Sequence, residues 1–234
     1  MIEMSLADGP GRAVPLQLRS VRGGGGPPPL IDSLVVVGRP QTVRLTADRT
    51  TDDPELTRFI GADASRWHYH LVGLSCTFTP TDDQQLATAW IQVELANVAA
   101  PNAEPPVATS LEPLRLERIQ PISVTAKIAV PCVFVSELGI TRGGESRQVM
   151  VEARYEGTSR PAWHLTEASA WPISGIQRLR LIARVPANTD AVGRVSIGAS
   201  IRYRRFGSRA FSYRSRTEGT ADGPTFQLST AVEN

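Results

Sequence analysis

Two histidines one residue apart are the first candidates for chemistry in this sequence. His68 and His70 stand in the sequence WHYH, and alternate residues of a β-strand share one face. Two imidazoles on one face could contribute to a zinc site, which needs at least one further protein ligand. The remaining histidine is His164, and no Asp or Glu lies at a matching spacing. We therefore predict structural or surface histidines and no metal site, and a metal-dependent enzyme is the third of three hypotheses.

The sequence signatures of common catalytic sites do not occur. There is no G-x-S-x-G nucleophile elbow, no P-loop and no G-x-G-x-x-G fingerprint. The GGES stretch at Gly143–Ser146 is typical of a turn, and the pairs Asp52–Asp53 and Asp82–Asp83 also fall in turn-like stretches. We predict that the chain is not an enzyme and uses no cofactor.

Arginine is the most distinctive chemical group in the chain. Of 25 cationic residues 24 are Arg, and the net charge is only +2. The segment Ile176–Arg216 holds ten Arg and one acid, Asp190, for a local net charge of +9, whereas the rest of the chain carries 15 basic and 22 acidic residues. A guanidinium group binds carboxylate or phosphate through two parallel hydrogen bonds. A GC-rich coding bias explains the preference for Arg over Lys, but the clustering predicts a basic surface.

Alternation of apolar and polar residues indicates the elements that position these groups. Such alternation is typical of half-buried antiparallel strands, and it predicts an all-β fold, an antiparallel β-sandwich of roughly eight to ten strands. One short connector helix is expected in DDPELTRFIG, where Asp53 can cap, Pro54 fits the first position and Gly61 can end the helix. The clearest alternation covers residues 70–78, 87–95, 122–130, 149–155, 179–185 and 195–203.

The same alternation places the arginines of the basic segment on an outer face. For the last hairpin, a loop of three or five residues around Gly207 would bury Tyr203, Phe211 and Tyr213 together. A two-residue turn would instead place Arg202 beside Tyr213. We prefer the longer loop, because the aromatic area that it buries outweighs the cation–π pairs that it gives up. The predicted partner-binding residues are Arg178, Arg180, Arg194, Arg202, Arg204, Arg205, Arg209, Arg214 and Arg216.

The N-terminal part differs from the rest in composition. A strand-like stretch, VPLQLRSVR, precedes GGGGPPP, so we predict an arm and tether over residues 1–29 and a sandwich domain over residues 30–234. The arm is either a disordered tail or a strand that pairs with a sheet edge, its own or a neighbour's. No signal peptide or membrane span is evident, so a soluble cytoplasmic protein is expected. Cys76 and Cys132 are then most simply buried thiols.

Two stretches of the sequence also show a weak internal similarity. Trp67 and Trp171 each precede a strand, an acidic turn and a return strand, about half a chain apart. Two hairpins of one shape are expected, and shared turn chemistry is the simpler explanation for them.

These features favour a non-catalytic β-sandwich that works by association, as an interaction module or the subunit of an oligomer or complex. Its partner would be an acidic protein surface or other copies of the chain. The alternative is binding of nucleic acid through the phosphate backbone at the same arginines. Membrane binding is not expected, because no amphipathic basic helix is evident.

Overall fold

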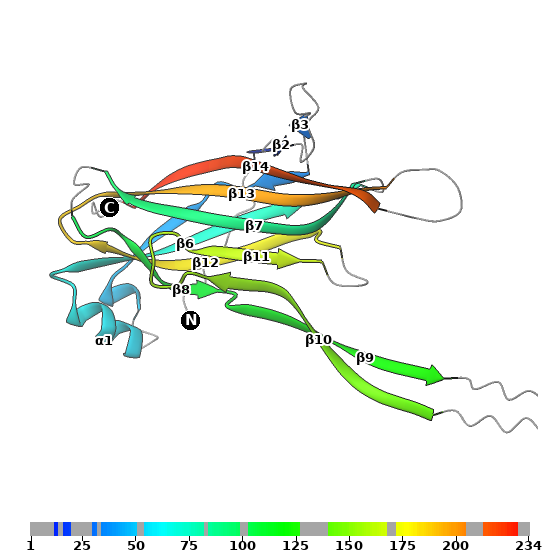
Figure 1. Ribbon diagram of the computed structural model, residues 1–234. Helices are drawn as coiled ribbons and strands as arrows, with labels where there is room; N and C mark the ends of the chain where they lie inside the picture. Colours follow the sequence, from blue (N-terminus) through cyan, green and yellow to red (C-terminus); the bar gives the residue numbers. More distant parts are fainter. Residues whose placement is uncertain are drawn as a thin grey trace, which may run out of the picture.

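The fold is an antiparallel β-sandwich made of two packed sheets (Figure 1), which confirms the predicted class. The described part of the chain forms 14 strands, several of them very short, and one α-helix, so the strand number expected from sequence was too low. The structure, a computed structural model, describes residues 12–13, 16–19, 30–31, 34–50, 54–81, 84–98, 103–126, 140–167, 172–204 and 213–228.

The first sheet has six strands in the order β1-β4-β6-β12-β8, and β5 also pairs with β6. Its two long central strands pair along their whole length, from Trp67 opposite Pro186 to Phe78 opposite Gly175. The strand bounds are β1 Arg12–Ala13, β4 Val35–Val37, β5 Gln41–Leu45, β6 Trp67–Phe78, β8 Val107–Glu112 and β12 Gly175–Pro186.

The second sheet has eight strands in the order β3-β2-β14-β13-β7-β11-β10-β9. The arm predicted from sequence contributes β2, which pairs with β14 of the same chain through Leu18 opposite Gly219. The domain boundary at residue 29 stays a prediction. The bounds are β2 Leu16–Arg19, β3 Leu30–Ile31, β7 Gln84–Asn97, β9 Arg115–Ala126, β10 Ile140–Arg154, β11 Ala162–Thr166, β13 Ala191–Arg204 and β14 Tyr213–Leu228.

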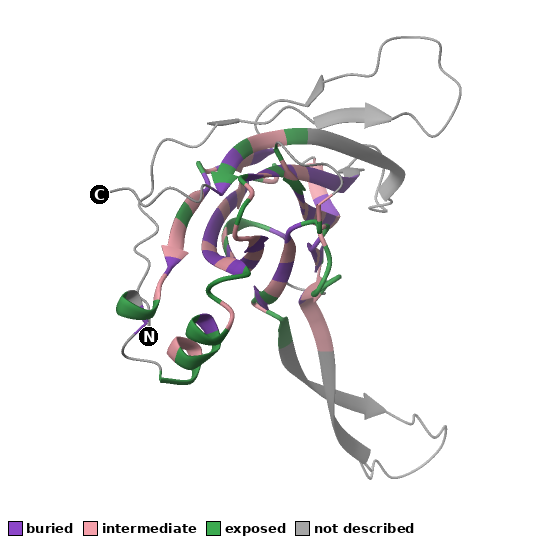
Figure 2. Cartoon of the chain, turned by 90° about the vertical axis from the view of Figure 1, so that its left-hand side faces the viewer, coloured by how far each residue is buried: buried purple, intermediate pink, exposed green. Residues whose placement is uncertain are grey.

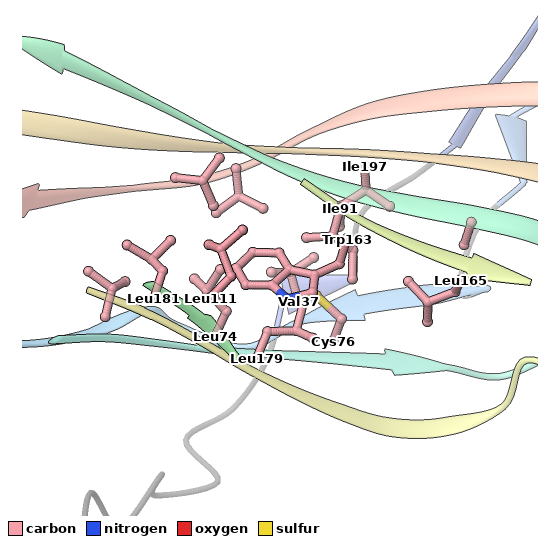
Figure 3. Close-up of a cluster of buried hydrophobic side chains, with 14 of the residues drawn as sticks. Val37, Leu74, Cys76, Ile91, Leu111, Trp163, Leu165, Leu179, Leu181 and Ile197 are labelled. Atoms are coloured by element: carbon pink, nitrogen blue, oxygen red, sulfur yellow. The ribbon is translucent and has the colours of Figure 1, made fainter. Parts of the chain in front are cut away.

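The core lies between the two sheets. Trp163 from β11 is fully buried and lies among aliphatic side chains of both layers, including Leu74 and Leu179 from the first sheet and Ile91 from the second (Figure 3). Buried and less buried residues alternate along the long strands (Figure 2). This is the alternation that the sequence displays, and it supplies the burial of apolar area that stabilises the fold.

The two expected hairpins are instead connections between the sheets. β6 pairs with β12 and β7 pairs with β13, whereas neither β6–β7 nor β12–β13 is a paired hairpin. The two units match in size, because β6 and β12 have 12 residues each and β7 and β13 have 14 each. The internal similarity of the sequence therefore corresponds to two equivalent strand–turn–strand units, which run antiparallel to each other through the centre of the sandwich.

A second, smaller apolar cluster covers the outer face of the first sheet. The helix α1 (Pro54–Ala62) buries Ile60 against Trp67 and Tyr69 of β6, and Phe59 packs at a tilt on Tyr69 with ring centroids 5.2 Å apart. The predicted helix is confirmed, with Pro54 at its first position, although Gly61 lies inside its last turn. Asp53, the expected cap, lies outside the described residues.

Candidate interaction surface

The predicted arginines divide between the two sheets. Arg178 and Arg180 lie on β12 in the first sheet, whereas Arg194, Arg202 and Arg204 lie on β13 in the second. Because the outer faces of a sandwich point in opposite directions, the arginines of β12 and those of β13 do not form one surface. The sequence could not show this division, because it does not show that the chain changes sheet between β12 and β13. Arg214 and Arg216 lie on β14, beside β13, and Arg205 and Arg209 lie outside the described residues.

The arginines of β12 meet acidic residues of the same chain. Arg180 lies 3.6 Å from Glu112 at the end of β8. Arg184 lies 3.7 Å from Glu104, and its guanidinium carbon lies 4.2 Å above the Trp67 ring centroid. Sequence reasoning did not identify Glu104 or Glu112 as partners, since each is distant in sequence from its arginine. These pairs balance part of the charge that seemed to need an external partner.

The other arginine of β12, Arg178, is exposed and has no ion-pair partner within the described part of the chain. It therefore lies on the outer face of the first sheet, in a different sheet from the arginines of β13 and β14.

On the second sheet, Arg194 lies opposite an acidic residue. Its Cα partner on β7 is Glu94, and the Glu94 carboxylate also pairs with Arg160 at 2.6 Å. Both members of that ion pair are substantially exposed, so the pair adds little to stability. Arg194 thus has an acidic residue as its Cα partner, as Arg180 has in Glu112.

The end of the β13–β14 pair is different. The backbone register places Arg202 opposite Arg216, and Arg204 opposite Tyr213, with a register shift between them. Neither register expected from sequence gives this pairing, because eight residues separate the paired Arg204 and Tyr213, whereas the expected turns have two to five. A bulge between Arg202 and Arg204 then shifts the register once more. On the other side of β13, Arg202 has Gln85 as its Cα partner. No Asp or Glu occurs in the sequence from Ala191 to Thr217.

The two candidate metal ligands, His68 and His70, lie on β6 in the first sheet. His70 is 2% exposed and its Nε2 has no hydrogen-bond partner within the described residues. The pKa of His70 is lowered to about 4, mainly by burial and also by the nearby Arg44 and His68. Burial likewise lowers the pKa of His68. His164 lies on β11 in the other sheet, and the described residues contain no group of three His, Cys, Asp or Glu that could hold a metal ion.

Cys76 is a buried thiol, as expected. It lies in the main core, and burial raises its pKa to about 12. A thiol in this state is a poor nucleophile, because the thiolate is the reactive form. Cys132 lies outside the described residues.

Comparison with known proteins adds no family. No family model matches the chain, and no curated protein matches it in sequence. Among solved structures the chain is similar to one described as a "Pore forming protein", with a TM-score of 0.38 and 8% identity over 83% of this chain and 89% of that chain. A likeness at this level bears on neither activity nor partners. In the described residues, no helix has the length and apolar character needed to span a membrane.

Proposed function

We propose that this protein is a non-catalytic β-sandwich subunit that associates with an acidic protein surface, either on another copy or on a different protein. Association occurs at the arginine end of β13 and β14, defined by Arg202, Arg204, Arg214 and Arg216. A cytoplasmic location and an oligomeric or complexed state belong to the same proposal. The β2 arm pairs with β14 of the same chain, through Leu18 opposite Gly219, and would support the arginine end by holding β14 in the sheet.

The main support for this proposal is the position of Arg202 opposite Arg216 in the pairing of β13 with β14. Like charges directly opposite each other destabilise a sheet. Two other arginines on the sheets have an acidic residue nearby: Glu112 lies near Arg180, and Glu94 is the Cα partner of Arg194. At the arginine end the Cα partner on β7 is the neutral Gln85. An acidic surface from another molecule would remove the repulsion.

A head-to-tail contact between copies fits the charge distribution. The segment Ile176–Arg216 has a net charge of +9, and the rest of the chain, with 15 basic and 22 acidic residues, has a net charge of −7. Unlike surfaces that meet in this way give heterologous contacts, which close into rings or continue as filaments.

The test is the solution mass of the wild type and of the variant R202S/R204S/R214S/R216S, by size exclusion with light scattering at low and high salt. The wild type should form a complex that dissociates in high salt, and the variant should keep its circular dichroism spectrum but not associate. Unfolding of the variant would show that the arginines are structural and would overturn the proposal. An excess of absorbance at 260 nm that nuclease removes would support the nucleic-acid alternative instead.

A further inference from the structure

The strand β9 forms an open edge of the second sheet. It is the last strand in the sheet order, and it pairs with β10 on one side while no described strand pairs with the other. By contrast, the last strand of the first sheet is covered, because Ala108 of β8 exchanges backbone hydrogen bonds with Gly157 and Thr158. In Figure 1 the β9–β10 ribbon extends well beyond the rest of the sandwich. A row of free backbone groups on such an edge is a template for another strand.

Near the base of the ribbon, the backbone groups of two charged residues point away from the protein. The Leu114 carbonyl accepts a hydrogen bond of 2.8 Å from the Ala153 amide, so Leu114 faces β10. Since successive residues of a strand direct their backbone groups to opposite sides, those of Arg115 and Glu117 face the open edge. Pro121 has the same alternation, and a proline without an N–H is tolerated in that orientation on an edge strand.

The side chains at this place are self-complementary. Leu116 is a large apolar residue that is 45% exposed. It lies between Arg115 and Glu117, whose side chains pair with each other at 2.5 Å and are 55% and 28% exposed. If a second copy is laid antiparallel on the edge with the twofold axis at Leu116, Arg115 of each copy lies opposite Glu117 of the other. The two Leu116 side chains then meet.

We propose that β9 is a self-association surface, at which two copies pair antiparallel around Leu116 and join their sheets. The backbone groups of Arg115 and Glu117 form the hydrogen bonds, their side chains form a network of four charges, and Leu116 is covered by its counterpart. This surface is distinct from the arginine end of β13 and β14 and does not depend on it. The pairing involves a short stretch centred on Leu116, so the interface is small and dimerisation is expected to need high protein concentration.

The experiment uses charge reversal on the full chain, with the mass measured by sedimentation velocity over a range of protein concentrations. The variants R115E and E117R each place like charges opposite each other across the dimer, and each should weaken dimerisation at least about tenfold. An equimolar mixture of R115E and E117R should form a heterodimer, because every opposed pair is then of unlike charge. The double variant R115E/E117R should again form a dimer with itself.

If the mixture dimerises, the charges must pair between the two chains. Neither single variant has residues of opposite charge at positions 115 and 117 of its own chain, so an effect within one chain cannot explain the recovery. A wild type that remains monomeric throughout, single variants that dimerise like the wild type, or a mixture that stays monomeric would each overturn the proposal. The variant R202S/R204S/R214S/R216S should keep this dimer, and E117R should keep the salt-sensitive association proposed above, so either surface can fail without the other.

Discussion

Gly193 of β13 lies beneath the ring of Phe226, its Cα partner on β14. A Cβ atom added to Gly193 would overlap the phenyl ring. Phe226 is only 7% exposed and belongs to the main core, so the ring has little space into which it could move. The glycine is therefore required by close approach between neighbouring strands.

We predict that Gly193→Ala destabilises the protein by about 1–3 kcal/mol, the usual cost of forcing extra volume into a packed core. Urea unfolding followed by circular dichroism would measure the change. The matched control is Gly61→Ala in α1, where no atom lies within 4 Å of the added Cβ and alanine should stabilise the helix by up to about 1 kcal/mol. Equal effects from the two substitutions would contradict the role assigned to Phe226.

The fold class follows from the sequence because the pattern that specifies it is local. Alternation along residues 70–78 or 195–203 reports burial on one face, and Pro54 marks a helix start. Sheet assignment is not local in this way. The connection between β6 and β7 has the turn chemistry of a hairpin, but the partners of these strands, β12 and β13, are about 100 residues away in the sequence.

The candidate site was predicted only in part, because the sheet to which each strand belongs is not specified by local sequence. Outward-facing arginines on β12 and β13 were expected on one surface, and the change of sheet after Pro186 separates them. The acids that meet Arg180 and Arg184 come from β8 and the segment before it, and no spacing rule connects them. The open edge of β9 could have been suspected from Pro121 in the middle of an alternating strand, since proline in a sheet is typical of an edge.

Arg184 contributes to stability by covering Trp67, and its charge matters less. The guanidinium lies over the ring, but its Nε is buried without a hydrogen-bond partner in the described structure, and the contact with Glu104 is long and exposed. We predict that Arg184→Ala costs about 1–2 kcal/mol through lost packing. Arg184→Met keeps an apolar side chain over the ring and should change stability by less than about 0.5 kcal/mol. The substitution removes the charge, but it also removes the buried Nε that has no hydrogen-bond partner in the described structure.

Urea unfolding and tryptophan fluorescence would check this prediction, with a red shift of the emission expected for Arg184→Ala as Trp67 becomes hydrated. Glu104→Gln is the control for the ion pair and should have little effect, since exposed pairs contribute at most about 1 kcal/mol. A loss in Arg184→Met as large as that in Arg184→Ala would show that the cation–π interaction dominates.

Lowering the pH should decrease the free energy of unfolding through protonation of His70. Its pKa is lowered to about 4 in the folded state, mainly by burial and also by Arg44 and His68, whereas a histidine in the unfolded chain has its ordinary pKa of 6.5. The unfolded chain therefore binds a proton first as the pH falls. The stability from neutral His70 is present in full above about pH 6.5 and is lost between there and about pH 4, amounting to about 3 kcal/mol.

The measurement is the free energy of unfolding in urea at several pH values from 7 to 4, for the wild type and for His70→Gln, which cannot titrate. The other titrating groups are common to both proteins, so the difference between the two curves isolates His70. We expect the wild type to lose more stability than His70→Gln as the pH falls. His164→Gln on the partly exposed outer side of β11 is the control and should keep most of the wild-type slope. Parallel curves for the wild type and His70→Gln would show that His70 is not held neutral by burial.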